Sequence, residues 1–451
     1  MIAEQSHAAE REPLSHDWGI EPIPQAARRL RLWDYSILWA DLGVGMLVLV
    51  AGSLLVPGLG LSQALVAIVV GTLVGNLLLA MAGVVGSDTG VPTMVSLRPA
   101  LGLRGSYLPS ALNIVQLIGW AAFEVLIMAQ AANAITQSLL GVSNYMVWVA
   151  FFAILSTFMA VLGPVTIVKK WLEKVGVWAV LLTTLYLTWY IVTHFDMAAL
   201  FAQQGTGDLS FWAGVDLVVA MPVSWLPLVS DFSRFARRSG DAFWGTYVGY
   251  FIANVWFYAL GAVMMMALKL NDPMELIPSI ATLAGGTLAL LIILVDETDN
   301  AFANIYSTAV SAQNIVPKLS LRTVAVGIGA VVAILAAALP LADYEWFLLL
   351  IGSVFVPLFG ILAADYFIVR RRNYATAELF RSDGIYWYHG GFNIAGIVAW
   401  LLGVGVYQWI SRALPELGAT IPSFVVSLVA YIILASLLRV GRRAPGAEQK
   451  A

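Results

Sequence analysis

The sequence of 451 residues contains no cysteine and only four histidines, so disulfides and thiolate metal sites are excluded. Charge is also scarce, because Asp, Glu, Lys and Arg together make up 11% of the residues. No GxxxxGK(S/T) phosphate-binding loop occurs, which excludes an ATP-driven pump of the P-loop kind. The sequence shows no set of residues spaced to bind a catalytic metal, and no nucleophile with a matching general base. We therefore expect no enzyme activity, no cofactor and no metal other than a coupling Na⁺.

Apolar residues dominate the remaining composition. Hydrophobic residues make up 60% of the chain and the mean hydropathy is +0.84. A run of about 20 apolar residues spans a bilayer as a helix, and twelve such runs can be marked. They are 34–56, 62–83, 106–139, 145–162, 171–194, 211–229, 242–268, 279–312, 321–339, 345–367, 392–410 and 421–438. We predict an all-α integral membrane protein with 12 transmembrane helices. We expect it to lie in the lipid bilayer, to bind no nucleic acid and to function as a monomer.

The basic residues indicate the orientation of these spans. With the twelve runs taken as spans, 22 of the 24 Lys and Arg fall on one side. Positive residues are retained in the cytoplasm, so we expect both termini to be cytoplasmic and the protein to lie in the inner cell membrane. The polar N-terminal tail lacks a basic region before a cleavage site, so no signal peptide is expected. Clusters such as Lys169 with Lys170 are interpreted as topology anchors.

Two of the predicted helices contain residues that interrupt helical backbone. The first run carries Asp41, Gly43 and Gly45 near its middle, and the sixth carries Pro222 and Pro227. Paired interruptions in two halves of a chain are typical of the binding site of secondary transporters. Alternatively, these residues only kink packed helices. The two interruptions are five spans apart, and because five is an odd number, the second half has the inverted orientation in the membrane. We therefore divide the chain into a tail (1–33), a five-helix repeat (34–200), an inverted repeat (208–368), helices 11 and 12 (369–438) and a C-terminal tail (439–451).

Acidic residues inside apolar runs indicate sites, because a carboxylate at mid-membrane costs at least about 2.5 kcal/mol. Asp41 lies in the first interruption, and the eighth run contains Thr298 and Asp299 ahead of a polar stripe that includes Asn304. Oxygen ligands of this kind suit a hard cation such as Na⁺. A stripe of polar residues could instead hold helices together. Other acids in or near the runs are Glu124, Asp216, Asp296 and Glu297.

In the third run, Trp120 and Glu124 are four residues apart and share a helix face. An indole can stack on a flat heterocycle while the carboxyl group accepts hydrogen bonds from ring or amino N–H groups. Trp225, beside the second interruption, is a further candidate for stacking. Most of the 16 tryptophans are expected to pack in the core or at the membrane interface.

Six sequence blocks are informative beyond their composition. They are DWGIEPIP (17–24), GVP (90–92), RPALGLRGS (98–106), GWAAFE (119–124), SDFSRF (230–235) and NIYS (304–307). In these blocks, and over nearly its whole length, the chain resembles the nucleobase:cation symporters, the family of cytosine, purine, allantoin and hydantoin permeases. Within that family, the inner loop, the stretch 221–227 and the segment AFWG (242–245) look most similar to the branch of the hydroxymethylpyrimidine transporters.

The resemblance implies a LeuT-like fold with helices 1 and 6 discontinuous, and it implies roles for particular residues. By the family pattern, Trp120 stacks on the base, Glu124 stands where an amide is usual, and Asn304 faces the substrate. Two departures affect this pattern: Pro222 replaces an aromatic residue, with Trp225 a turn later, and Asp299 replaces a hydroxyl or amide. The implied substrate-binding residues are Gly43, Trp120, Glu124, Trp225 and Asn304. The implied cation-binding residues are Asp41, Thr298 and Asp299, with carbonyls of Leu42 and Val295.

The function expected from these features is symport of a pyrimidine-type nucleobase, or of a heterocycle like hydroxymethylpyrimidine, by alternating access. The coupling ion is either Na⁺ or H⁺, because Asp41 and Asp299 leave proton coupling open. A LeuT-fold symporter for an organic amine or an amino acid is the main alternative, since Asp41 or Glu124 could pair with a cationic amine. A nucleobase sensor that transports nothing ranks lower, because the short tails leave no room for a signalling domain.

Overall fold

The computed structural model describes residues 18–163, 177–340 and 344–440. Within these ranges the chain is built from helices joined by turns and short loops, and no strand longer than an isolated bridge occurs there. The predicted all-α fold is confirmed. Residues 1–17 and 441–451 of the predicted tails and the anchors Lys169 and Lys170 lie outside the described residues.

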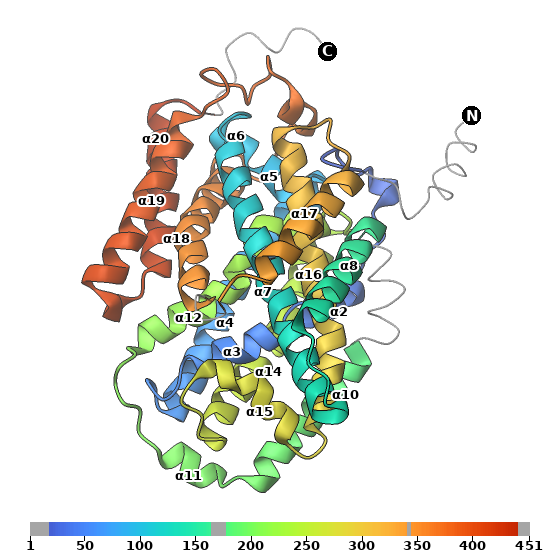
Figure 1. The fold of residues 1–451 in the computed structure, drawn as a ribbon. Coiled ribbons are helices and arrows are strands. Elements are labelled where there is room, and N and C mark those ends of the chain that lie inside the picture. The colour runs from blue at the N-terminus through green and yellow to red at the C-terminus, as the bar shows by residue number, and fades with distance from the viewer. Residues whose placement is uncertain (1–17, 164–176, 341–343, 441–451) are drawn as a thin grey trace.

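A helix lies in each predicted apolar run, although the boundaries shift (Figure 1). Among the described helices, eight are long and apolar enough to cross a membrane, or nine if α2 and α3 form one span. The count of twelve spans therefore stays a prediction. The main helices are α2 (Leu32–Asp41), α3 (Met46–Ser53), α4 (Leu61–Thr89), α7 (Tyr107–Leu140), α8 (Tyr145–Leu162), α10 (Val177–His194), α12 (Phe211–Ser224), α13 (Val229–Ser233), α14 (Ser239–Ala267), α16 (Gly286–Ile315), α17 (Leu321–Ala336), α18 (Tyr344–Ala363), α19 (Ile394–Ala413) and α20 (Thr420–Leu437).

The helices pack in three groups. One group, here called the bundle, contains α2, α3, α4, α12 and α14, in which α14 packs on α2, α3 and α4, and α12 packs on α4. A second group, the scaffold, contains α7, α8, α16 and α17, with α7 and α16 in the most extensive contact. The third group consists of α18, α19 and α20, which lie together at one edge of the molecule (Figure 1). The first and sixth predicted spans thus belong to the bundle, and the third and eighth to the scaffold.

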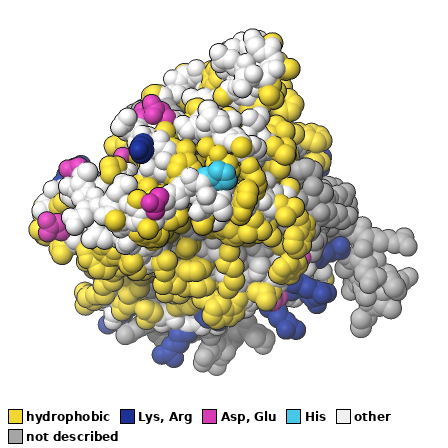
Figure 2. All heavy atoms as spheres, turned by 90° about the horizontal axis from the view of Figure 1, so that it is seen from below, with side chains coloured by type: hydrophobic (Ala, Val, Ile, Leu, Met, Phe, Trp, Pro, Cys, Tyr) yellow, Lys and Arg dark blue, Asp and Glu magenta, His cyan; other side chains and the backbone are white. Residues whose placement is uncertain are grey.

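The outer surface of the helices is apolar, as a lipid environment requires. Large side chains such as Ile154, Leu182 and Ile334 are each about 70% exposed. Figure 2 shows a broad hydrophobic surface, with acidic side chains scattered over the end of the molecule that carries α11 (Met197–Ala202) and α15 (Leu276–Thr282). Many polar side chains, by contrast, are buried in the interior, where they form the sites described below.

The opposite end of the molecule is closed by short segments between the long helices. The helices α5 (Thr93–Ser96) and α6 (Arg98–Leu101) lie there (Figure 1), together with the first described residues of the chain. The tail is fastened by hydrogen bonds from Ile23 N to Gly90 O (3.0 Å) and from Leu30 N to Phe235 O (3.0 Å). The Arg28 guanidinium donates to Ser87 O, so the tail is held against the ends of α4 and α13.

Candidate functional site

The first predicted interruption is a sharp break in the structure. Helix α2 ends at Asp41, α3 begins at Met46, and their axes differ in direction by 61°. The backbone groups freed by the break find partners on α16, because Met46 N donates to Glu297 Oε2 (2.7 Å) and Asn300 Nδ2 donates to Val44 O (3.1 Å). Buried breaks need such partners, since lipid offers none. Helix α16 therefore holds the two halves of the broken span in place.

Gly45 permits the close approach of the break to α16. A Cβ atom at this position would lie 2.9 Å from Glu297 Oε2 and 3.2 Å from Asn300 Nδ2. Any larger residue would therefore displace the two side chains that satisfy the broken backbone. The glycine in the first run is thus needed for space around α16, which the sequence alone does not reveal.

The sixth predicted span changes helix type at its interruption. Helix α12 contains Pro222 and ends at Ser224, and a 3₁₀ turn (Leu226–Leu228) with Pro227 joins it to α13. Gly75 of α4 makes room for the Pro222 ring, because a Cβ atom there would lie 2.3 Å from Pro222 Cγ. Pro222 thus packs against the bundle, and Trp225 follows directly where α12 ends.

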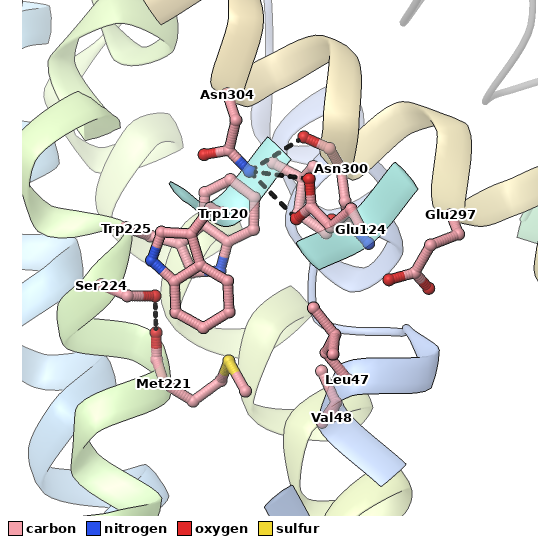
Figure 3. A pocket seen from close by; sticks show the side chains of 11 residues that line it. Leu47, Val48, Trp120, Glu124, Met221, Ser224, Trp225, Glu297, Asn300 and Asn304 are labelled. Carbon is pink, nitrogen blue, oxygen red and sulfur yellow. Dashed lines mark hydrogen bonds between the residues drawn. The ribbon is translucent and has the colours of Figure 1, made fainter. Parts of the chain in front are cut away.

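A cavity lies between the two interrupted spans and the scaffold (Figure 3). It is bounded by α7, α12, α16 and the α2–α3 break, so residues far apart in the sequence meet around it. The full lining is Leu42, Leu47, Val48, Trp120, Glu124, Met221, Ser224, Trp225, Glu297, Asn300 and Asn304.

The polar wall of the cavity is a hydrogen-bonded pair from two helices. Asn304 Nδ2 donates to both carboxylate oxygens of Glu124, at 3.0 Å each, and also contacts Asn300 O at 3.2 Å. Both side chains are at most 3% exposed. In Figure 3 the amide oxygen of Asn304 points away from Glu124, on the side of the two tryptophans. The wall therefore offers acceptors, a carboxylate and an amide oxygen, because the amide N–H groups of Asn304 are turned to Glu124 and Asn300.

The aromatic wall consists of two tryptophans held edge-on by neighbouring rings. Trp120 packs against Tyr344 and Phe347, with ring centroids 5.7 and 5.4 Å apart, and Trp225 packs against Trp39 at 6.1 Å. Edge-to-face packing leaves part of each indole face open to another ring. The buried Nε1 of Trp120 has no acceptor among the described residues. The aromatic wall thus combines flat indole faces with one hydrogen-bond donor, the Nε1–H of Trp120.

The cavity has a volume of about 20 Å³. That is enough for a water molecule, which needs roughly 10–15 Å³, and too little for a six-membered ring. Binding of a ring therefore requires side chains of the lining to move. Met221, whose side chain reaches into the cavity from α12 in Figure 3, is flexible enough to do so.

Three carboxylates form a cluster beside the cavity. One oxygen from each of Asp41, Asp296 and Asp299 lies within 4.8 Å of the other two, and each residue is at most 3% exposed. Both oxygens of Asp41 and of Asp299, and Oδ1 of Asp296, have no hydrogen-bond donor among the described residues. Three ionised carboxylates so close in an apolar interior need a cation or protons between them. Thr298, one position before Asp299, donates to Val295 O at 2.7 Å.

The structure brings most of the predicted site residues together. Trp120, Glu124, Trp225 and Asn304 line the cavity, and Asp41 meets Asp299 in the carboxylate cluster. Gly43 is not part of the lining, and its Cα faces Ala253 and Tyr250 of α14 instead.

Several lining and cluster residues were not predicted as site residues. Asp296 carries no sequence signal beyond being an acid in an apolar run, yet it completes the carboxylate cluster. Glu297 is one more acid of the same apolar run and Asn300 a polar residue one turn before Asn304, but their contact with the α2–α3 break depends on how α16 packs. Met221 and Ser224 precede Trp225, so their place beside the second interruption was the available signal.

Replacing Glu297 tests whether it stabilises the break through an acceptor oxygen. Glu297→Ala leaves Met46 N buried without a partner, which we expect to cost about 1–3 kcal/mol of stability. Glu297→Gln keeps an acceptor of the same shape and should cost clearly less. Thermal unfolding of both purified variants measures the difference, and equal midpoints for the two would show that the hydrogen bond does not hold the break.

Comparisons with known proteins agree with this architecture. A family profile described as permease for cytosine/purines, uracil, thiamine, allantoin matches residues 22–433. The chain is 24% identical to the hydantoin permease of Microbacterium maritypicum over 433 residues, which cover 92% of this chain and 86% of that protein. It is also 24% identical to the cytosine permease of Escherichia coli (strain K12) over 426 residues, 92% of this chain and 94% of that protein.

A solved structure has the same fold. Mhp1, a nucleobase-cation-symport-1 family transporter in a closed conformation with bromovinylhydantoin bound, matches with a TM-score of 0.82 at 20% identity, over 94% of this chain and 96% of Mhp1. The predicted LeuT-like fold is thereby confirmed, and the relatives are permeases and not enzymes, as predicted. The chain belongs to the family of permeases for cytosine/purines, uracil, thiamine and allantoin, and it is a multi-pass membrane transporter.

Proposed function

We propose that this permease is a cation-coupled symporter that imports a pyrimidine-type nucleobase or a heterocycle like hydroxymethylpyrimidine. The observation that carries the proposal is the cavity in which a stacking wall, Trp120 and Trp225, meets a hydrogen-bonding wall, Glu124 and Asn304. A planar ring with polar edges uses both walls at once. Its transport by alternating access would move the bundle relative to the scaffold, because the cavity lies between these two groups of helices.

The polar wall favours a ring with an amino group. Glu124 and the amide oxygen of Asn304 accept hydrogen bonds, so the matching edge of the substrate carries N–H donors. An aminopyrimidine presents such an edge, whereas the oxo edge of uracil places acceptors against acceptors. Unpaired buried acceptors lower affinity strongly, which gives the site its selectivity. Cytosine and hydroxymethylpyrimidine therefore rank above uracil as substrates.

The carboxylate cluster is the proposed site of the coupling cation. Asp41, Thr298 and Asp299, with carbonyls of Leu42 and Val295, would bind Na⁺ or exchange H⁺, and Asp296 adds a third carboxylate. Leu42 also lines the substrate cavity, directly after Asp41 in the chain. A cation that pulls the break toward α16 would thus shape the substrate site. Such coupling works only if the cation binds the two states of the transporter with different affinities.

The orientation in the membrane follows from charge. We place the end with α5 and α6 in the cytoplasm of the inner cell membrane, because the basic segments of the chain gather at the loops of that side. We propose that the monomer is the functional unit, since substrate and cation sites are both built within one chain.

An organic amine is the second candidate substrate, favoured by the two acidic side chains, Glu124 and Glu297, in the cavity lining. A cationic amine would pair with a carboxylate directly, without needing the tryptophan faces. The two candidates differ in how they respond to loss of charge at Glu124.

Replacing Glu124 by glutamine tests the substrate assignment. The amide keeps the size of the side chain but loses the negative charge and one acceptor, so we expect the affinity for cytosine and hydroxymethylpyrimidine to fall by roughly 10- to 100-fold, while uracil loses little. Binding of the three compounds to the purified variant measures this. Glu416→Gln, at an exposed acid near α20, is the matched control and should change nothing. If pyrimidines bind unchanged and amine binding is lost, the amine assignment replaces the present one.

A further inference from the structure

A second cavity lies at the end of the molecule that carries α5 and α6, apart from the substrate site. Its volume is about 560 Å³, within the roughly 300–1,000 Å³ that is usual for small-molecule sites. The tail, the segment after α6, the end of α16 and the 3₁₀ helix η7 (Thr376–Phe380) enclose it. Residues that matter for its chemistry are Trp18, Glu21, Arg98, Tyr107, Gln313 and Phe380.

Arg98 supplies a buried positive charge to this cavity. The residue is 2% exposed, and its guanidinium donates to Asn314 Oδ1 (3.1 Å), Leu379 O (2.9 Å) and Asn314 O (3.4 Å). These three acceptors are neutral, and none of the ion pairs found among the described residues includes Arg98. Arg370, which is also largely buried, is paired with Asp365 at 3.2 Å. A guanidinium has five N–H groups, so Arg98 has donors left for an anion.

The charge of Arg98 persists at neutral pH. Burial lowers the pKa of the guanidinium to about 10, which still leaves it protonated under physiological conditions. A buried cation without a charged partner is costly, and an anion that enters the cavity would remove much of that cost. Arginine also binds phosphate and carboxylate groups with particular strength through paired N–H donors.

The remaining lining suits a planar ring. Trp18, Tyr107 and Phe380 contribute aromatic surface, and the Arg98 guanidinium lies 5.0 Å from the centre of the Phe380 ring. The buried Oε1 of Gln313 has no hydrogen-bond donor among the described residues, so it is available to a ring N–H or a hydroxyl group. Glu21 lines the same cavity but is exposed, so water and salt screen its charge.

The cavity is connected to the moving parts of the transporter through the tail. Arg234, which follows α13, donates to Gly19 O at 2.6 Å and to the Tyr306 hydroxyl of α16 at 2.9 Å. Gly19 itself packs on Gln313 with a φ of +48°, a position where a Cβ atom would lie 2.9 Å from Gln313 Oε1. A ligand in the cavity would therefore contact the tail and α16, which Arg234 connects to the end of α13. Helix α13 in turn packs on α4 of the bundle.

We propose that this cavity binds a planar heterocycle that bears a phosphate group, with the phosphate on Arg98 and the ring among Trp18, Tyr107 and Phe380. Occupation fastens the tail to the scaffold and slows the movement of the bundle, so the ligand inhibits transport from this side. The inhibition rests on the proposed transport function, whereas binding does not.

Calorimetric titration of the full-length protein in detergent tests the binding, with cytidine monophosphate, inorganic phosphate and cytidine as probes. We expect cytidine monophosphate to bind more tightly than either of the others. Arg98→Gln should weaken it by at least about tenfold, whereas Glu21→Gln should tighten it only slightly, because the charge of Glu21 is screened. Arg104→Gln, an exposed arginine on the neighbouring loop, and Trp120→Ala, in the substrate site, are controls that should leave it unchanged.

Further variants keep the test decisive if Arg98→Gln does not fold. Ser382 is exposed at the cavity, so Ser382→Trp fills it without disturbing the core and should abolish binding. Equal affinity for wild type and Ser382→Trp would overturn the proposal. Binding of cytidine monophosphate that appears only after removal of residues 1–17 would also overturn it, because residues 1–17 would then be the natural occupant of the cavity. A third contrary result is displacement of cytidine monophosphate by phosphatidylglycerol, which would assign Arg98 to a lipid headgroup.

Inhibition is measured separately in proteoliposomes loaded with cytidine monophosphate. We expect slower uptake in wild type and no slowing in Ser382→Trp. If the protein binds cytidine monophosphate but transports no pyrimidine, the transport proposal fails while the binding site stands. If it transports but neither binds nor responds to cytidine monophosphate, only the present inference fails.

Discussion

Replacing Asp299 by asparagine is expected to abolish concentrative uptake, so that the substrate inside proteoliposomes never exceeds its outside concentration. Asparagine has nearly the same shape, so the fold and the substrate cavity should persist. The variant loses one of the three buried carboxylates that we propose as the site of the coupling cation. Loss of this carboxylate should remove the differential cation affinity that coupling needs. Exchange of labelled for unlabelled substrate across the membrane, which needs no gradient, should continue. Accumulation and exchange measured on the same vesicles separate the two effects.

The thermal stability of Asp299→Asn and a control substitution at the surface show whether a loss of accumulation is specific to the cluster. Removing a buried charge that lacks a hydrogen-bond donor should leave the thermal midpoint of Asp299→Asn unchanged or raised in the absence of the coupling cation. Asp383→Asn, the same substitution at an exposed residue paired with Arg381, should retain full accumulation. Undiminished gradient-driven accumulation in Asp299→Asn would remove Asp299 from the coupling site.

Trp120→Ala is expected to weaken substrate binding by roughly 5- to 150-fold, because stacking of a base on an aromatic ring contributes about 1–3 kcal/mol. The open face of the indole is lost, and the ring contacts with Tyr344 and Phe347 that position it are lost as well. Trp120→Phe restores an aromatic face without the Nε1 donor and should recover most of the affinity. Equilibrium binding of labelled hydroxymethylpyrimidine or cytosine to the purified variants measures both.

The lipid-facing surface provides the matched control for this substitution. Trp409 on α19 is 60% exposed, so Trp409→Ala removes an indole of the same size without touching the cavity. It should bind substrate as the wild type does. Equal losses in Trp120→Ala and Trp409→Ala would indicate general damage to the protein, and no loss in Trp120→Ala would remove the stacking wall from the account.

The fold and most of the candidate site could be predicted from the sequence because they depend on strong local signals. Long apolar runs mark helices, and Asp41 with Gly43 and Gly45 marks the first break, whose helices meet at 61° in the structure. The spacing of Trp120 and Glu124 places both on one face of α7, and both line the cavity. These features need no knowledge of how the helices pack.

What the sequence could not reveal depends on helix rotation and on contacts between distant helices. Asp296 and Glu297 are neighbours on α16, yet the first joins the carboxylate cluster and the second caps α3, because α16 turns them in different directions. Gly43 is predicted to bind substrate by the resemblance, but in the structure it packs against Ala253 and Tyr250 of α14. The cavity at Arg98 is lined by four segments that are distant in the chain, so its existence cannot be predicted from any one of these segments.

The close spacing of the two sites explains how a gradient could drive uptake. The α2–α3 break contributes Asp41 to the carboxylate cluster and Leu42 to the cavity lining, and α16 contributes Asp299 to the first and Asn304 to the second. In the proposed mechanism, a cation bound in the cluster would therefore act on the same two elements that line the cavity. Binding of one ligand should strengthen binding of the other by an equal factor, as linkage requires.

The most direct test of this account is uptake of labelled hydroxymethylpyrimidine and cytosine into proteoliposomes of the wild-type protein, with either a Na⁺ gradient or a pH gradient imposed. We expect accumulation above the outside concentration under one of the two gradients, and its collapse when an ionophore dissipates that gradient. Uptake of both compounds that merely equilibrates, with either gradient present or absent, would contradict cation-coupled symport. Absence of uptake of either compound under both gradients would contradict the proposed substrate.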